Sequence, residues 1–187
     1  MNTQEEIQHY RNTERRHMIA AKDALMHGVP RLADGNTGDT DFVLACVNYL
    51  DFIIGRFVRQ GHANTASIRE VVPDDDAEDQ RTLADIEDTL DDTHKQIECL
   101  LAASGQFQSG DIDIEAFANA CGEFLDFYNR VLARRKDPAQ AIVQKHIDAD
   151  TYWRQTDDVT VESIETEKAL FGKIRQLAPP GLQIEVG

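Results

Sequence analysis

The sequence is poor in basic residues and has no long uncharged apolar run. Lys and Arg number 19 against 34 Asp and Glu, which gives a formal net charge of −15. Nucleic-acid binders and proteins that bind anionic membranes need a basic face, so this balance argues against both kinds of partner. No apolar stretch approaches the ~18 residues of a membrane span. The N-terminus is polar and does not resemble a signal peptide. We therefore expect a cytoplasmic protein.

Cysteines, sheet patterns and common catalytic motifs are also scarce or missing. Cys46, Cys99 and Cys121 are odd in number and widely spaced, which excludes a disulfide framework and a zinc set. They lie in apolar helical patterns, so we expect reduced cysteines in the core. Sustained alternation of apolar and polar residues is absent, and this predicts no sheet. Without a P-loop, a dinucleotide fingerprint, GxSxG or HExxH, an enzyme is the less favoured class.

The sequence does contain long stretches with apolar residues at helical spacing. The longest runs from Phe42 to Val72 without a proline, and the five prolines of the chain fall near the expected ends of helices. Together the stretches predict an all-α, up-down-up-down four-helix bundle with a short extra helix and a C-terminal helix. The predicted helices are Thr3–Gly28, Phe42–Val72, one from the acidic DDDAEDQ to a loop at Ser104–Gly110, one from Asp111 or Asp113 to about Lys136, a short AQAIVQKHI helix and Thr160–Leu177.

One histidine on each of the first three predicted helices is a candidate metal ligand. These are His17, His62 and His94. Imidazole suits zinc and iron, and three such ligands with a water would form a site with an open position. His17 and His94 fall on the apolar sides of their helices, whereas His62 lies away from the row of apolar residues on its predicted helix. The alternative is that His17 and His94 are partly buried, hydrogen-bonded residues and His62 lies at a helix edge.

Several segments resemble a known family. The segment RHMIAAKDAL contains His17, and FVRQGHANTASIREVVP contains His62. LDDTHKQIECL contains His94, and QKHIDADTYW follows a proline-bearing turn. In this order they resemble the hemerythrin-like (HHE cation-binding) domains over roughly residues 10 to 155. The resemblance implies a four-helix bundle whose inward-facing histidines and carboxylates hold a di-iron site, with His17 at the first ligand position.

The ligand positions depart from the family pattern. Val58 stands where the family has a histidine on the second helix, and the third helix offers a single imidazole. On the fourth helix the ligand positions fall on Val131 and on Arg135 or Lys136. A buried cation beside a metal centre would be strongly repelled. The resemblance therefore implies the fold, with a reduced mononuclear site or no metal site.

Two functions follow from the sequence. The first is a divergent hemerythrin-like protein that binds iron or zinc through His17, His62 and His94 and senses or stores oxygen or iron. The second is a metal-free helical interaction or regulatory module in which these histidines are structural. We expect a bundle domain over residues 1–155 and a C-terminal helical extension over residues 156–187 packed on it. A homodimer through helical faces is the expected assembly.

Overall fold

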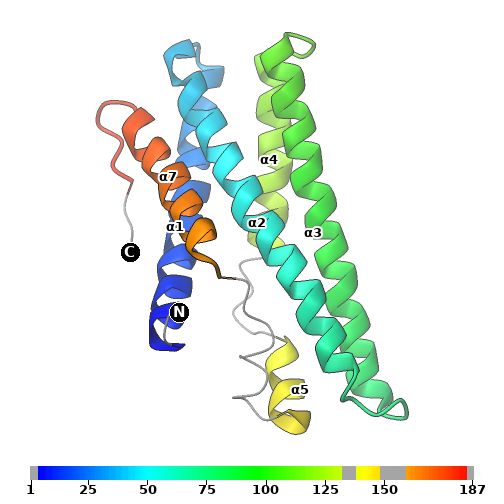
Figure 1. Cartoon of the computed structure of the whole chain (residues 1–187). Helices are drawn as coiled ribbons and strands as arrows, with labels where there is room; N and C mark the ends of the chain where they lie inside the picture. Colours follow the sequence, from blue (N-terminus) through cyan, green and yellow to red (C-terminus); the bar gives the residue numbers. More distant parts are fainter. Residues whose placement is uncertain (1–3, 132–137, 148–158, 185–187) are drawn as a thin grey trace. The chain divides into compact units, whose positions relative to one another are not determined.

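The computed structural model describes residues 4–131, 138–147 and 159–184 (Figure 1). These residues form helices and connections without any strand, which confirms the all-α prediction. Within the same residues, no helix combines the length and hydropathy needed to cross a bilayer. The α-helices are α1 (Gln4–Ala33), α2 (Thr40–Arg69), α3 (Ala77–Ser109), α4 (Ile114–Val131), α5 (Pro138–His146) and α7 (Val161–Leu177), with a 3-10 turn η1 (Thr37–Asp39) before α2.

The chain divides into two compact units whose boundaries fall inside α2 and α3 and near the end of α4. The first unit contains Met1–Ile53, Ile97–Asp126 and Val159–Gly187. The second contains Ile54–Gln96 and Phe127–Asp158. The first unit therefore includes α1, α7 and the first half of α2, and the second includes α5. The boundary predicted at residue 155 lies outside the described residues.

The first helix extends beyond its predicted end at Gly28 and Pro30. It continues to Ala33 with Pro30 inside it, and Gly35 ends it with a φ of +92°. The amide of Gly35 donates to Leu32 O at 3.1 Å and that of Asn36 to Arg31 O at 3.1 Å, the paired bonds of a Schellman motif. Pro30 has no N–H to donate within α1, and the helix continues for only three residues beyond it.

Gly28 allows α1 and α2 to approach each other closely. A Cβ atom at this position would lie 2.9 Å from Val43 Cγ2 and 3.0 Å from Phe42 Cε1. Both neighbours are buried, at 0% and 1% exposure, so neither side chain has room to move away. The glycine that we interpreted as a helix end is therefore a packing residue.

The third helix also runs further than predicted. We expected a loop over Ser104–Gly110, but α3 continues to Ser109 and Gly110 ends it with a φ of +82°. The added turn is stabilised by Phe107, whose ring stacks on Phe117 of α4 with centroids 4.8 Å apart. Exposed Gly105 lies inside the helix and is tolerated there, because this tertiary contact outweighs its low helix propensity.

The remaining helices agree more closely with the prediction. The side chain of Asp113 caps α4 by accepting the Ala116 amide at 2.9 Å, and Pro138 is the first residue of α5. Thr160 caps α7 through a reciprocal pair with Ser163. The predicted end of the fourth helix near Lys136 lies outside the described residues.

The core of the first unit is formed by α1, the first half of α2, the end of α3, α4 and α7. Cys46 and Cys121 are buried in it as predicted, and burial raises the pKa of Cys121 to about 12, so its thiol is unreactive. The prediction that Cys99 is a core residue is wrong, because its side chain is exposed on α3. Fully buried residues of this core include Leu25, Phe42, Tyr49, Leu50, Phe117 and Phe124.

In the second unit, the later part of α2 and the first part of α3 pair as an antiparallel hairpin, with α5 beside its turn (Figure 1). Ile142 of α5 is 2% exposed and enters a cluster with Ile68, Val72 and Leu83. Helices α2 and α3 approach closely at Gly61, where a Cβ would lie 2.6 Å from Leu90 Cδ2. The side chains packed around the α5 cluster are Ile86, Ala139, Val143 and Ile147.

Candidate functional site

The start of α3 and the end of α5 bring three potential metal ligands together in the second unit. Asp76 immediately precedes α3 and accepts the amide of Asp79 at 3.3 Å, so it caps the helix. Asp79 lies in the first turn, where the helix dipole favours a negative charge. His146 is the last residue of α5. The apolar cluster around Ile142 holds α5 against the hairpin, and this packing places His146 beside the two aspartates.

The three side chains have ligand atoms within 4.8 Å of one another. His146 Nε2 lies 2.7 Å from Asp79 Oδ2 and 3.7 Å from Asp76 Oδ2. The side chains of Asp76, Asp79 and His146 are 21%, 13% and 12% exposed, so they remain accessible from solvent. Among the described residues, no other three His, Cys, Asp or Glu side chains bring their ligand atoms this close together.

Lys145 contributes a cation to the same cluster. Its Nζ lies 2.6 Å from Asp76 Oδ2 and 2.8 Å from Asp79 Oδ2. Hydrogen bonds from Lys145 and His146 hold the pKa of Asp79 below its usual range, and the bonds to Asp76 and Asp79 raise the pKa of Lys145. The cluster thus combines two carboxylates, an ammonium and an imidazole.

The lowered pKa of Asp79 predicts a loss of stability in acid. The folded protein binds a proton at Asp79 more weakly than the unfolded chain does, so the stabilising effect is fully present above the ordinary Asp pKa of ~3.9 and is lost as pH falls below it. Between about pH 5 and pH 3, wild type should therefore lose more stability than Asp79→Asn, as measured by urea unfolding. Identical losses in the two proteins would contradict the prediction.

The structure places His17 in a buried hydrogen-bonded cluster of the first unit. Its Nδ1 lies 2.8 Å from Oε1 of Glu167 on α7, and its ring stacks on Phe171 with centroids 3.9 Å apart. The hydroxyl of Tyr49 on α2 donates to the same Oε1 at 2.8 Å. Because Glu167 occupies Nδ1, a metal would have to bind His17 through Nε2, the arrangement in which a carboxylate orients a metal-ligating imidazole.

Glu167 is the centre of this cluster. It is 0% exposed, and its Oε2 is buried without a hydrogen-bond partner among the described residues. Burial, and next the charge of Glu167, raise the pKa of Tyr49, so the phenol stays protonated and donates. A second buried carboxylate, Glu14 at 1% exposure, accepts the Tyr10 hydroxyl at 3.1 Å. The cluster ties α7 to α1 and α2 within one chain.

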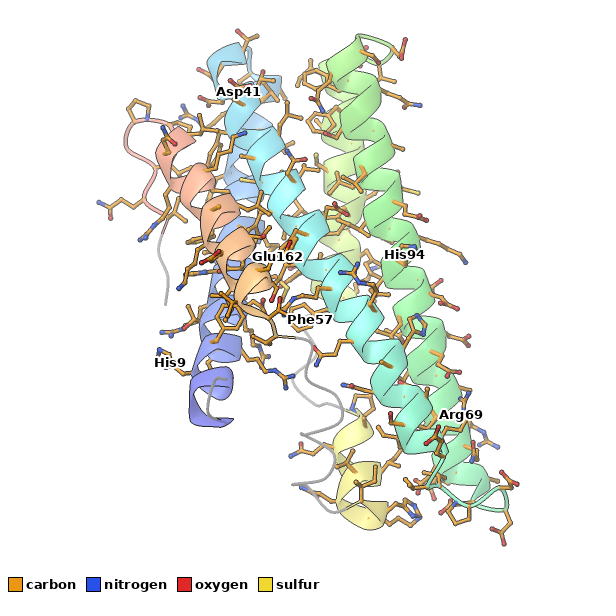
Figure 2. The ribbon with its side chains drawn as sticks, viewed as in Figure 1. His9, Asp41, Phe57, Arg69, His94 and Glu162 are labelled. Atoms are coloured by element: carbon orange, nitrogen blue, oxygen red, sulfur yellow. The ribbon has the colours of Figure 1, made fainter. Side chains whose placement is uncertain are left out.

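His62 and His94 belong to the second unit. His62 Nε2 lies 3.3 Å from Asp91 Oδ1, and its side chain is 40% exposed. His94 was expected on the apolar side of its helix, but its side chain is exposed. Figure 2 shows His94 partway along α3, away from the turn that follows Arg69. His17 lies in the first unit, so the shared site of His17, His62 and His94 stays a prediction.

Sequence reasoning missed Asp76, Asp79, His146 and Glu167 as site residues. The sequence marks the acidic DDDAEDQ only as the start of a helix, and His146 is not among the three histidines predicted to bind a metal. One signal was available: in an up-down-up-down bundle, the turn between the second and third helices lies at the same end as the end of the fourth helix. A histidine soon after that end would thus meet the acidic turn. Glu167 had no comparable signal in the sequence.

Comparisons of the chain with protein-family models, with curated proteins and with solved structures find no match. The resemblance to hemerythrin-like domains therefore stays a prediction, and the chemistry of the chain's own residues carries the functional proposal.

Proposed function

We propose that this chain is a helical protein that binds a divalent metal, and that Asp76, Asp79 and His146 are the metal ligands. One observation carries the proposal: the ligand atoms of these three side chains lie within 4.8 Å of one another. Two carboxylates and an imidazole suit zinc or ferrous iron, and three protein ligands leave a position for water. The proposal keeps the expected metals but moves the site from the three predicted histidines to the start of α3.

Small side-chain movements would bring the His146 imidazole to a suitable ligand spacing from both carboxylates. Ligands about 2.0–2.2 Å from a tetrahedral zinc ion are roughly 3.3 Å from one another. His146 Nε2 is 2.7 Å from one carboxylate and 3.7 Å from the other, so shifts of well under about 1 Å adjust these two distances. The partial exposure of all three side chains allows the ion to exchange with solvent, as storing or sensing a metal requires.

We also propose that the long helices form a hemerythrin-like four-helix bundle. The connections support this proposal, because only residues 34–39, 70–76 and 110–113 separate consecutive helices from α1 to α4. In such a bundle, the metal joins α5 to the first turn of α3 and so fastens a short helix to one end of the bundle.

Zinc titration of protein purified without an affinity tag tests the proposed site. We expect one zinc ion per chain and a higher melting temperature with zinc, because a ligand that binds only the folded state stabilises it. Asp79→Asn and His146→Ala should each weaken zinc binding by at least about tenfold, as expected for losing one of three ligands. Asp92→Asn is the matched control, since Asp92 is an exposed acid of α3 outside the site. Equal zinc binding by all four proteins would refute the site.

The metal-free alternative is supported by Lys145. Its ammonium already lies 2.6 Å and 2.8 Å from the two carboxylates and offsets their charge without a metal. On this second proposal, the cluster only holds α5 in place within a helical interaction module. The absence of any zinc-dependent change in melting temperature would favour it.

A further inference from the structure

The proposed metal site contains its own competing cation. Lys145 Nζ contacts Oδ2 of both Asp76 and Asp79, and Oδ2 of Asp79 is also the atom that His146 contacts. A metal bound by these oxygens would lie within a few ångströms of the ammonium. Two positive charges that close repel each other, and only one of them can use the same lone pairs.

We propose that Lys145 and a divalent metal occupy the two carboxylates alternately, so that Lys145 is an internal competitor that regulates metal binding. This inference rests on the proposed function, because it concerns the same site. In the metal-free state, the ammonium bridges the two aspartates. In the metal-bound state, Lys145 extends into solvent and the ion takes its place beside His146.

The surroundings of Lys145 permit this exchange. Its side chain is 54% exposed, so it can leave the carboxylates without opening the core. The neighbouring His146 is only 12% exposed, and Ile142, one turn earlier, is buried in the apolar cluster. Helix α5 is therefore held by its packing in both states, and the lysine alone changes position. Surface ion pairs contribute modestly to stability, so displacing Lys145 from its two carboxylates weakens metal binding without preventing it.

The exchange predicts that removing the lysine charge strengthens metal binding. Lys145→Met should bind zinc about tenfold more tightly than wild type, because the competing cation and its repulsion are both lost. Lys95→Met is the matched control: it removes the same charge from an exposed lysine of the second unit, 3.9 Å from Asp92. Its affinity should stay within about twofold of wild type, since distant exposed charges are screened.

A second measurement uses wild-type protein and therefore requires no substitution in α5. Zinc saturation should raise the rate at which an amine-reactive reagent labels Lys145, relative to Lys95, as followed by mass spectrometry. The reason is that the ammonium loses its two carboxylate partners when the metal enters. Amide hydrogen exchange of α5 should stay unchanged or slow down, because the helix remains docked.

The outcomes separate the two proposals. If wild type binds zinc through Asp79 and His146 but Lys145→Met binds no more tightly and the labelling of Lys145 does not rise, the exchange is refuted and the metal site stands. If neither wild type nor Lys145→Met binds zinc at these ligands, the metal site is refuted and the exchange with it. Tighter binding by Lys145→Met together with faster labelling in wild type supports both.

Discussion

Replacing Glu167 with alanine is expected to destabilise the protein by about 3 kcal/mol, since it leaves a buried hydroxyl and a partly buried imidazole without their acceptor. The Tyr49 hydroxyl and His17 Nδ1 both lie 2.8 Å from Glu167 Oε1, and Tyr49 is 0% exposed. Each unsatisfied donor costs roughly 1–3 kcal/mol, and removing a buried charge offsets part of the total. For a chain of this length, the melting temperature should fall by about 6–12 °C.

Urea unfolding of three variants tests the role of Glu167. Glu165→Ala is the matched control, because Glu165 is an exposed glutamate of the same helix, and its loss should change stability by less than about 0.5 kcal/mol. Glu167→Gln keeps one oxygen acceptor, so it should lose much less than the alanine variant. Hydrogen exchange of α7 amides should accelerate in Glu167→Ala, because α7 loses its polar link to α1 and α2. Equal stability of the two alanine variants would contradict the prediction.

The sequence predicted the helices themselves well, because each one carries its own apolar face. Its errors fall where a tertiary contact decides. Gly28 and Pro30 look like a helix end, but α1 continues to Ala33, and Gly28 instead allows close packing against Phe42. The turn before Gly110 looks like a loop, but the stacking of Phe107 on a ring of α4 keeps it helical.

The site was much harder to predict because its residues are distant in the sequence. His146 and Asp79 are separated by 67 positions, and no periodicity along the chain relates them. Glu167 and His17 are 150 positions apart, and the pattern of α7 gave no reason to expect a buried carboxylate. His94 shows the opposite error: a helical count placed it on the apolar side of α3, but the side chain is exposed. Counting residues on one helix cannot tell which part of a broad stripe a neighbour covers.

Replacing Ile142 with alanine should release α5 and weaken metal binding without changing any ligand. Ile142 is 2% exposed among Ile68, Val72 and Leu83, and deleting its larger part from such a cluster costs about 2–4 kcal/mol. An isolated helix of nine residues is not stable in water, so α5 depends on this packing. Amide exchange in α5 should therefore accelerate by roughly 30- to 1,000-fold, the range that corresponds to this free energy.

In a Lys145→Met background, where no competing lysine leaves the aspartates together with His146, the same substitution should lower zinc affinity by at least about tenfold, because His146 moves away from the two aspartates when α5 undocks. Ile142→Val should retain most of the affinity, since it removes a single methylene and costs about 0.5–1.5 kcal/mol. Gln144→Ala, a change at an exposed position of the same helix, is the matched control and should bind zinc as wild type does. If Ile142→Ala released α5 in the Lys145→Met background but left the zinc affinity of that background unchanged, the ion would have to be held without His146. Affinity that falls in step with the docking of α5 would place His146 among the ligands.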